Sequence, residues 1–290
     1  MALNSPLGTG SGTDRIIVQE RHIAVDGVNW RYQQAGSGPA LLLVHGLLGY
    51  SFSWRFAIPM LARHATVYAV DLPGAGFSEF PPGTDSRLPS FGQRLLHFMD
   101  VAGVPSCDLL GTSYGGAVAM MAAASAPQRF PRLILVAPVN PWSERGKTLS
   151  VVLSSPVVAP VFSFAAPRLS SVQNHYLRRL YADPRRIPPG TLEGYMGPLR
   201  RRGAFKRGIG VLRSWNRDLH ELELALPRIA DIPTLLIWGD RDAAVDPASA
   251  FRLKEKFRRC ELMMFEEVGH LPYEETPGNF NRAVIQFLTK

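Results

Sequence analysis

A chain of 290 residues has room for one large α/β domain, or for a core domain that carries an inserted subdomain. Hydrophobic residues make up 46% of it and charged residues 19%, which excludes a disordered or fibrous protein. The net charge of +8 is unevenly spread, because 14 basic and four acidic residues between Ser143 and His220 give that segment +10 and leave −2 for the rest.

Alternating strand and helix patterns fill the first half of the chain. Residues 1–14 are rich in glycine, serine and threonine and lack a signal-peptide pattern, so they predict a flexible tail and a cytoplasmic protein. Residues 15–24 and 28–33 flank Asp26-Gly27 and read as a hairpin. Strands are then predicted at 40–44, 66–70, 108–110 and 133–137, with helices at 53–64, 90–101 and 117–126 between them. This order implies a parallel sheet with helices on both faces.

The alternation stops after the sixth strand. Residues 141–227 contain helical patches broken by prolines and arginines, and no comparable strand. Strand patterns resume at 233–238 and 262–265, with helices at 247–257 and 279–288. We therefore expect one core, formed by residues 15–140 and 228–290, that carries residues 141–227 as an insertion.

The two cysteines of the chain, Cys107 and Cys260, lie far apart in the sequence. One begins an apolar strand and the other sits between a helix and a strand. Buried free thiols are therefore expected in place of a disulfide or a metal site.

A Gly-x-Ser-x-Gly pattern stands between the strand at 108–110 and the Ala-rich helix. Gly111 and Gly115 flank Ser113, and side chains at those two positions would clash with the neighbouring strand and helix. The turn pushes Ser113 out at the end of the sheet, near the positive end of the following helix. By itself the pattern is weak, because a Gly-rich turn is an ordinary feature of proteins.

A nucleophilic serine needs a general base, and the base needs an acid that orients it. Asp240 and Asp242 follow the strand at 233–238, and His270 follows the strand at 262–265. The order serine, acid, histidine, each after a predicted strand, is that of α/β-hydrolase chemistry.

With these motifs in place, the chain resembles the α/β-hydrolase superfamily, and within it the capped group of esterases, epoxide hydrolases and carbon–carbon bond hydrolases. The resemblance runs from about Gly27 to Lys290. It rests on His45-Gly46, Asp71-Leu72-Pro73-Gly74, Gly111-Thr112-Ser113-Tyr114-Gly115-Gly116, Trp238-Gly239-Asp240-Arg241-Asp242 and Val268-Gly269-His270. It implies an eight-stranded, mainly parallel sheet with helices on both faces and an inserted helical cap.

The resemblance also implies roles for single residues. Ser113 is the expected nucleophile, His270 the general base and Asp242 the acid, with Asp240 and Asp246 as weaker rivals for the acid. Asn140 could not replace a carboxylate, since it lacks the charge that stabilises an imidazolium.

The backbone N–H groups of Leu47 and Tyr114 are expected to form the oxyanion hole. His45, Gly46, Gly111 and Gly115 support the shape of these loops, and His45 is expected to shape the oxyanion loop without taking part in the chemistry. No metal or cofactor is required.

Departures from the family pattern narrow the expected activity. A serine at position 113 argues against both haloalkane dehalogenase and epoxide hydrolase activity, because the enzymes of this group that this chain resembles use aspartate there for those reactions. Thr112 and Tyr114 replace the Asn and Met often seen in carbon–carbon hydrolases. We expect a serine hydrolase that cleaves a small-molecule carboxylic ester with an apolar part. A carbon–carbon bond hydrolase and a non-catalytic ligand-binding or accessory protein are the alternatives.

The insertion contains an uncharged apolar stretch at 149–167 and a basic surplus, and three interpretations of them stay open. The apolar stretch packs on the core as a cap helix, or it dips into a membrane while Arg178, Arg179, Arg185 and Arg186 face anionic headgroups. Alternatively, Arg200 to Arg202, Lys206 and Arg207 attract an anionic substrate. Nucleic-acid binding is not expected, because no recognition motif accompanies the charge.

Overall fold

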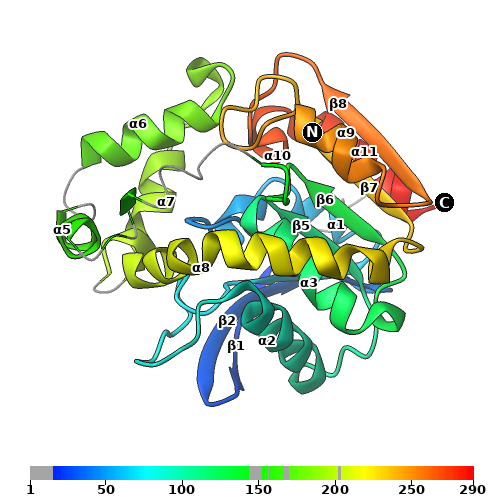
Figure 1. Cartoon of the computed structure of the whole chain (residues 1–290). Helices are drawn as coiled ribbons and strands as arrows, with labels where there is room; N and C mark the ends of the chain where they lie inside the picture. The colour runs from blue at the N-terminus through cyan, green and yellow to red at the C-terminus, as the bar shows by residue number, and fades with distance from the viewer. Residues whose placement is uncertain (1–15, 144–151, 154, 156, 166–169, 202–203) are drawn as a thin grey trace, which may run out of the picture.

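The computed structural model of the chain describes residues 16–143, 152–153, 155, 157–165, 170–201 and 204–290 (Figure 1). The predicted tail at 1–14, parts of the apolar stretch at 149–167, and Arg202 lie outside the described residues.

The described residues form one eight-stranded sheet in the order β1-β2-β4-β3-β5-β6-β7-β8. The antiparallel pairs are β1 with β2 and β2 with β4, and every other neighbouring pair is parallel. The predicted mainly parallel sheet is thereby confirmed. The strands are β1 (Gln19–Val25), β2 (Val28–Ala35), β3 (Ala40–Val44), β4 (Thr66–Val70), β5 (Asp108–Thr112), β6 (Leu133–Val136), β7 (Thr234–Gly239) and β8 (Cys260–Phe265).

Helices cover both faces of the sheet (Figure 1). One face packs on α2 (Leu88–Val101), α3 (Tyr114–Ser125), α8 (Ala204–Ala225) and α9 (Ala248–Lys254). The opposite face packs on α1 (Ile58–Leu61) and α11 (Pro277–Leu288). The central strands have a hydrophobic layer on each side, which explains their continuous apolar runs.

Strand β3 illustrates this arrangement. Leu42 and Val44 point into the layer of α2 and α3, whereas Leu41 and Leu43 point into the layer of α1 and α11. All four side chains are at most 1% exposed. Successive side chains of a strand point to opposite faces, so only a strand buried on both faces needs an unbroken apolar sequence.

The prediction of a continuous helix at 53–64 is wrong. This region forms a short 3₁₀ turn at Ser51–Trp54 and then α1 at Ile58–Leu61. Pro59 has no N–H to donate to the carbonyl one turn before it, and its ring clashes with that carbonyl, so it fits only in the first turn of a helix.

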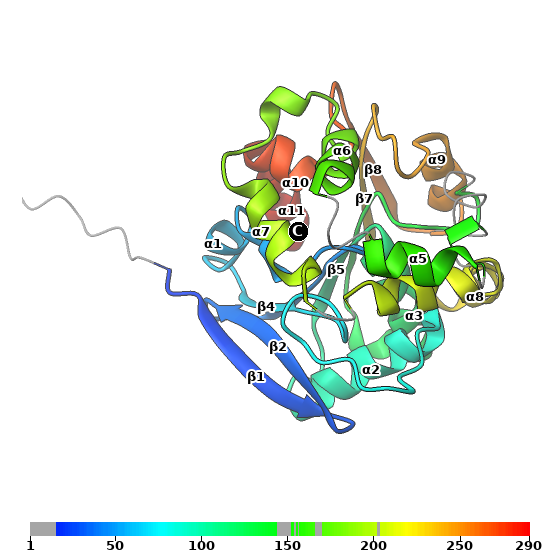
Figure 2. The same cartoon turned by 90° about the vertical axis from the view of Figure 1, so that its left-hand side faces the viewer.

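Between β6 and β7 the chain forms α5 (Val158–Ala165), α6 (Ser170–Leu180), α7 (Thr191–Leu199) and α8. Figures 1 and 2 show α5, α6 and α7 gathered to one side of the sheet, while α8 runs across α3. The side chain of Trp215 on α8 stacks on Tyr114 of α3, with ring centroids 6.3 Å apart. Helix α8 lies within the predicted insertion, yet it packs on the core. The boundaries of the insertion at residues 141 and 227 therefore stay predictions.

Exposed valines at and just before α5 bear on the membrane interpretation. Val157 and Val161 are 79% and 66% exposed. Of the four arginines predicted to face headgroups, Arg185 pairs with Asp183, and Arg186 donates to the carbonyl of Glu267. Among the described residues no helix is long and apolar enough to cross a bilayer. Peripheral membrane contact stays a prediction.

Both cysteines are free thiols. Cys107 is buried, as expected, and burial raises the pKa of its thiol to about 12. Cys260 is only partly buried, because it begins the edge strand β8.

A buried ionic network joins α6 and α7 to the core. The Glu274 carboxylate, in α10 (Pro272–Glu275), pairs with both terminal guanidinium nitrogens of Arg55, at 3.0 and 2.8 Å. The hydroxyls of Tyr181 and Tyr195 donate to the same carboxylate, and Arg55 also donates to Thr191 at 2.9 Å. Each donor neutralises part of a charge that is removed from water.

Replacing Glu274 by glutamine is expected to destabilise the protein by about 2–4 kcal/mol, because it leaves the partly buried guanidinium of Arg55 without its counter-charge. Chemical denaturation measures the effect. Glu193→Gln is the matched control, since Glu193 is exposed on α7. Equal free energies of unfolding for the two variants would contradict the interpretation of this network.

Candidate active site

Ser113 occupies a strained turn between β5 and α3. Its backbone has φ +54° and ψ −124°, a region that residues other than glycine rarely adopt. The Ser113 N–H donates to the carbonyl of Val136 at 2.9 Å, and the Ser113 carbonyl accepts from the N–H groups of Gly116 at 3.0 Å and Val139 at 2.9 Å. These bonds hold the strained conformation and fix the side chain at the start of α3, where it is partly exposed.

The two glycines of the turn are required by close backbone contacts. A Cβ atom at Gly111 would lie 2.5 Å from the carbonyl oxygen of Gly115. A Cβ atom at Gly115 would lie 2.3 Å from the carbonyl oxygen of His45. The second contact packs the serine turn directly against the loop after β3, so the predicted supporting residues lie together.

His270 and Asp242, from the loops after β8 and β7, are hydrogen-bonded to each other. His270 Nδ1 lies 2.7 Å from Asp242 Oδ2, and the two side chains are 5% and 0% exposed. The other carboxylate oxygen of Asp242 accepts from the N–H groups of Ala244 at 2.7 Å and Val245 at 2.9 Å. These bonds hold the carboxylate in place and aim Oδ2 at the imidazole. A carboxylate at Nδ1 places the proton there and leaves Nε2 as the basic nitrogen.

The rival acids occupy different positions. Asp240 is partly exposed, accepts from the Val268 N–H at 3.3 Å and lies 4.0 Å from the guanidinium of Arg241. Asp246 accepts from the N–H of Ala248, the first residue of α9, at 3.1 Å. Asn140 is buried and donates to Ser249 Oγ at 3.0 Å. Of the three aspartates, the one that hydrogen-bonds His270 is Asp242.

The loop that carries His270 is anchored by groups that the sequence did not reveal. The His270 N–H donates to the carbonyl of Leu180 at 2.7 Å, which ties the loop to the end of α6. Buried Glu275 accepts from the N–H groups of Gly269 at 2.7 Å and Ala182 at 3.1 Å. Burial raises the pKa of this carboxyl, and the backbone hydrogen bonds oppose that shift. In the sequence, nothing except its position five residues after His270 indicates that Glu275 anchors this loop.

His45 organises the loop that follows β3. Its Nδ1–H donates to the carbonyl of Gly46 at 2.7 Å, and its Nε2 accepts from the Leu72 N–H at 3.0 Å. The Gly46 carbonyl also accepts from the Gly49 N–H at 3.2 Å. Because the peptide plane is rigid and trans, fixing the carbonyl of Gly46 directs the Leu47 N–H the opposite way. His45 is therefore placed to position the loop and not to exchange protons.

One predicted oxyanion donor, Tyr114, follows Ser113 in the chain, and the other, Leu47, follows Gly46. Gly46, next to Leu47, approaches so closely that a Cβ atom there would lie 3.2 Å from Ser113 Cβ. The Tyr114 N–H opens α3, and its side chain is buried between Phe91 and Trp215, away from solvent. Only the backbone of Tyr114 is thereby available to a substrate. No hydrogen bond found among the described residues uses the backbone N–H of Leu47 or of Tyr114.

Burial lowers the pKa of His45 to about 3, and the nearby positive charge of Arg207 acts in the same direction. The folded state therefore resists protonation that the unfolded chain accepts below about pH 6.5, so stability present at neutral pH is lost as the pH falls from about 6.5 toward 3. When the pH falls from about 7.5 to about 5, His45 is expected to lower the free energy of unfolding by roughly 2 kcal/mol.

Chemical denaturation of the wild type and of His45→Gln at these two pH values measures that contribution. The variant is expected to lose about 2 kcal/mol less than the wild type over the interval. Equal pH dependence in the two proteins would show that His45 is not a buried neutral imidazole.

The site brings together groups suited to acyl transfer. Ser113, Asp242 and His270 come from loops after β5, β7 and β8, at the same edge of the parallel strands. A serine on a strained turn, an imidazole held by a carboxylate, and free backbone N–H groups beside the serine are the elements of nucleophilic catalysis. Among the residues the structure covers, no cluster of His, Cys, Asp and Glu is arranged to hold a metal ion.

Comparisons with known proteins agree with the fold. The model of the alpha/beta hydrolase family matches residues 41–283. A solved structure of 2-hydroxy-6-oxo-6-phenylhexa-2,4-dienoate hydrolase from Rhodococcus sp. strain RHA1 superposes with a TM-score of 0.81 and 22% identity, covering 95% of this chain and 100% of that one. At this identity the likeness shows a shared fold.

Two curated relatives carry different activities. The 2-hydroxy-6-oxo-2,4-heptadienoate hydrolase of Pseudomonas putida is 27% identical over 92% of this chain and 95% of its own length. The pimeloyl-[acyl-carrier protein] methyl ester esterase of Aeromonas salmonicida is 28% identical over 88% of this chain and 98% of its own length. The first name describes a hydrolase of a dienoate and the second an esterase.

Proposed function

Because the chain belongs to the alpha/beta hydrolase family, we propose that it is a serine hydrolase that cleaves a carboxylic ester through an acyl-enzyme on Ser113. Ser113 is the nucleophile, His270 the general base and Asp242 the acid that orients it. The backbone N–H groups of Leu47 and Tyr114 bind the oxyanion. No step of this chemistry needs a metal or cofactor.

In the first half of the reaction, His270 Nε2 accepts the hydroxyl proton as Ser113 Oγ attacks the ester carbonyl. Negative charge develops on the carbonyl oxygen, and the N–H groups of Leu47 and Tyr114 stabilise it without reorganisation. Asp242, 2.7 Å from Nδ1, stabilises the imidazolium that forms. The imidazolium then gives its proton to the departing alkoxide, which leaves an ester on Ser113.

In the second half, His270 removes a proton from a water molecule, and the resulting hydroxide attacks the acyl carbonyl. The same N–H groups bind the second oxyanion. Collapse of that intermediate returns the proton from His270 to Ser113 Oγ and releases the acid. Serine, base and acid are thereby restored.

The buried His270–Asp242 hydrogen bond is the observation that carries this proposal. Two buried ionisable side chains from separate loops meet at 2.7 Å, and Asp242 is held there by two backbone N–H groups. A structural histidine needs no carboxylate aimed at Nδ1, whereas a general base next to a nucleophilic serine does. The relative named as a methyl ester esterase supports an ester as the substrate.

Carbon–carbon bond hydrolysis next to a ketone is the second candidate. The relative named 2-hydroxy-6-oxo-2,4-heptadienoate hydrolase, which covers 92% of this chain, favours it. Ester cleavage is preferred, because Thr112 and Tyr114 flank the serine in place of the Asn and Met often seen in carbon–carbon hydrolases.

A comparison of kcat/KM decides between these candidates. The wild type is tested with a short-chain 4-nitrophenyl ester and with a vinylogous diketone acid. We expect faster ester turnover, a burst of 4-nitrophenol equal to the enzyme concentration, and labelling of Ser113 by a fluorophosphonate. A higher kcat/KM for the diketone acid would replace the ester proposal by the second candidate. Labelling without turnover of either compound would favour a ligand-binding protein.

A further inference from the structure

Arg207, on α8, is a buried cation with unused donors. Only 2% of it is exposed. One terminal nitrogen, Nη2, donates to the carbonyl of Leu47, while Nε and Nη1 are buried and have no hydrogen-bond partner. Buried N–H groups of a charged side chain are costly to leave unpaired, so this arrangement calls for an acceptor.

No acid nearby neutralises Arg207. Within the described part of the chain, no carboxylate lies within ion-pair distance of its guanidinium. Asp71, the carboxylate whose charge acts on Arg207, already accepts from the Ser51 N–H at 2.8 Å, from the Phe77 N–H at 3.0 Å and from Arg31 at 3.3 Å. Burial lowers the pKa of Arg207 to about 10, which still leaves the guanidinium charged at neutral pH. The positive charge is therefore available to an anion.

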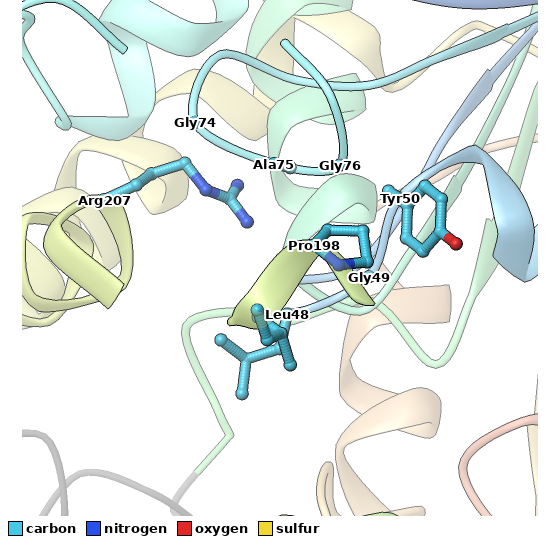
Figure 3. Close-up of a pocket in the computed structure, with 9 residues that line it drawn as sticks. Leu48, Gly49, Tyr50, Gly74, Ala75, Gly76, Pro198 and Arg207 are labelled. Carbon is cyan, nitrogen blue, oxygen red and sulfur yellow. The ribbon is translucent and has the colours of Figure 1, made fainter. Parts of the chain in front are cut away.

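The guanidinium borders a cavity beside the oxyanion loop. Figure 3 shows the side chain reaching from α8 toward Leu48, Pro198 and the loop at 74–76. The enclosed room is about 10 Å³, enough for the centre of about one oxygen-sized atom. Leu48 and Pro198 make one wall apolar, whereas the loop at 74–76 contributes backbone, so the cavity has room for one carboxylate oxygen against the guanidinium.

The cavity adjoins the reacting centre. Arg207 contacts the carbonyl of Leu47, whose N–H is a proposed oxyanion donor, and Gly46 before it touches Ser113. Gly46 and Leu47 of the oxyanion loop thus connect the surroundings of Ser113 with the guanidinium.

We propose that Arg207 is an anion-binding subsite for the substrate, and that its guanidinium binds a carboxylate carried by the ester at a point away from the scissile carbonyl. This inference rests on the proposed function and narrows its substrate class to esters that bear a second, ionised carboxylate. The basic residues from Arg200 to Arg207 were predicted to attract an anionic substrate. Among them, we assign direct contact with the substrate carboxylate to Arg207 alone. Exposed Arg201 donates instead to the carbonyl of Gly76 at 3.0 Å.

Matched ester pairs test the subsite. Mono-4-nitrophenyl succinate, glutarate and adipate place a carboxylate on the acyl side, and 4-nitrophenyl esters with a terminal isopropyl group are their neutral isosteres. Acetoxybenzoate and acetoxytoluene make the same comparison on the alcohol side. In the wild type we expect one charged ester to have a kcat/KM about 10- to 100-fold above its isostere, through a lower KM.

Variants separate binding of the carboxylate from support of the loop. Arg207→Met is expected to abolish the preference for the charged ester, and Arg207→Lys to retain part of it. Arg213→Met removes the same charge from an exposed position on the same helix and is expected to keep the wild-type preference. If Arg207→Met lost kcat equally on charged and neutral esters, Arg207 would only support the loop at Leu47. That result would overturn the subsite.

Two measurements keep the test decisive if a variant fails to fold or no ester is cleaved. If the wild type hydrolyses the neutral esters but shows no higher kcat/KM for any charged ester, on the acyl or the alcohol side, the subsite is overturned. The proposed function then stays intact. Calorimetric titration of Ser113→Ala with glutarate, and with inorganic phosphate as a free anion, reads the subsite without turnover. We expect glutarate to bind, and we expect the added Arg207→Met substitution to remove that binding. If phosphate binds and glutarate does not, or if neither anion binds, the carboxylate subsite is rejected.

Discussion

Replacing Ser113 by alanine is expected to lower kcat for a 4-nitrophenyl ester by at least about 10⁴-fold and to abolish fluorophosphonate labelling. The reason is the loss of the only group in the proposal that forms a bond to the substrate. The oxyanion donors and the binding site survive, so a small rate above that of water should remain. Steady-state kinetics and intact-protein mass measurement report the two effects.

Ser125→Ala is the control for this experiment. Ser125 ends α3, the helix that begins directly after Ser113, and its hydroxyl donates to the carbonyl of Met121 at 3.1 Å. This variant should keep kcat and labelling near the wild-type values. If Ser113→Ala retained most of its activity, another residue would have to be the nucleophile.

Asp242→Asn is expected to reduce kcat by about 10³- to 10⁴-fold with a small change in KM. An amide at this position would let its nitrogen face Nδ1 of His270, which reverses the tautomer and removes the basic lone pair from Nε2. The charge that stabilises the imidazolium is lost as well. Kinetics on the neutral ester, with circular dichroism to confirm folding, measure the effect.

Asp240→Asn provides the matched comparison, because Asp240 follows the same strand but is partly exposed and bonded to the Val268 N–H. We expect its kcat to stay within a few-fold of the wild type. A larger loss in Asp240→Asn than in Asp242→Asn would assign the acid to position 240 and contradict the site described above.

Local sequence patterns were sufficient for most of the fold. The runs that became β3 and β6 are buried on both faces, and only strands between two helix layers need such uniform apolarity. The serine turn was equally readable, because Gly111 and Gly115 meet backbone atoms that leave no room for a Cβ atom. Strand burial and the contact between Gly111 and Gly115 involve neighbouring residues, so local sequence patterns reveal them.

Features that depend on distant residues were not readable. In the sequence, Arg207 is one of five clustered basic residues expected to attract an anion, and only the structure shows that α8 buries it against Leu47. Glu274 meets Arg55 across 219 positions of the chain, and no local pattern signals that partner. Even the break at Pro59 was missed, because the flanking apolar spacing still resembled a helix. Burial of a charged side chain is a tertiary property.

Mass analysis of the enzyme quenched during turnover of a 4-nitrophenyl ester tests the proposed acyl-enzyme most directly. The protein is expected to gain the mass of one acyl group, and peptide fragmentation should place that group on Ser113. In Ser113→Ala the gain should disappear. Turnover of the ester without any acylated protein, or an acyl group located on another residue, would contradict the proposed mechanism.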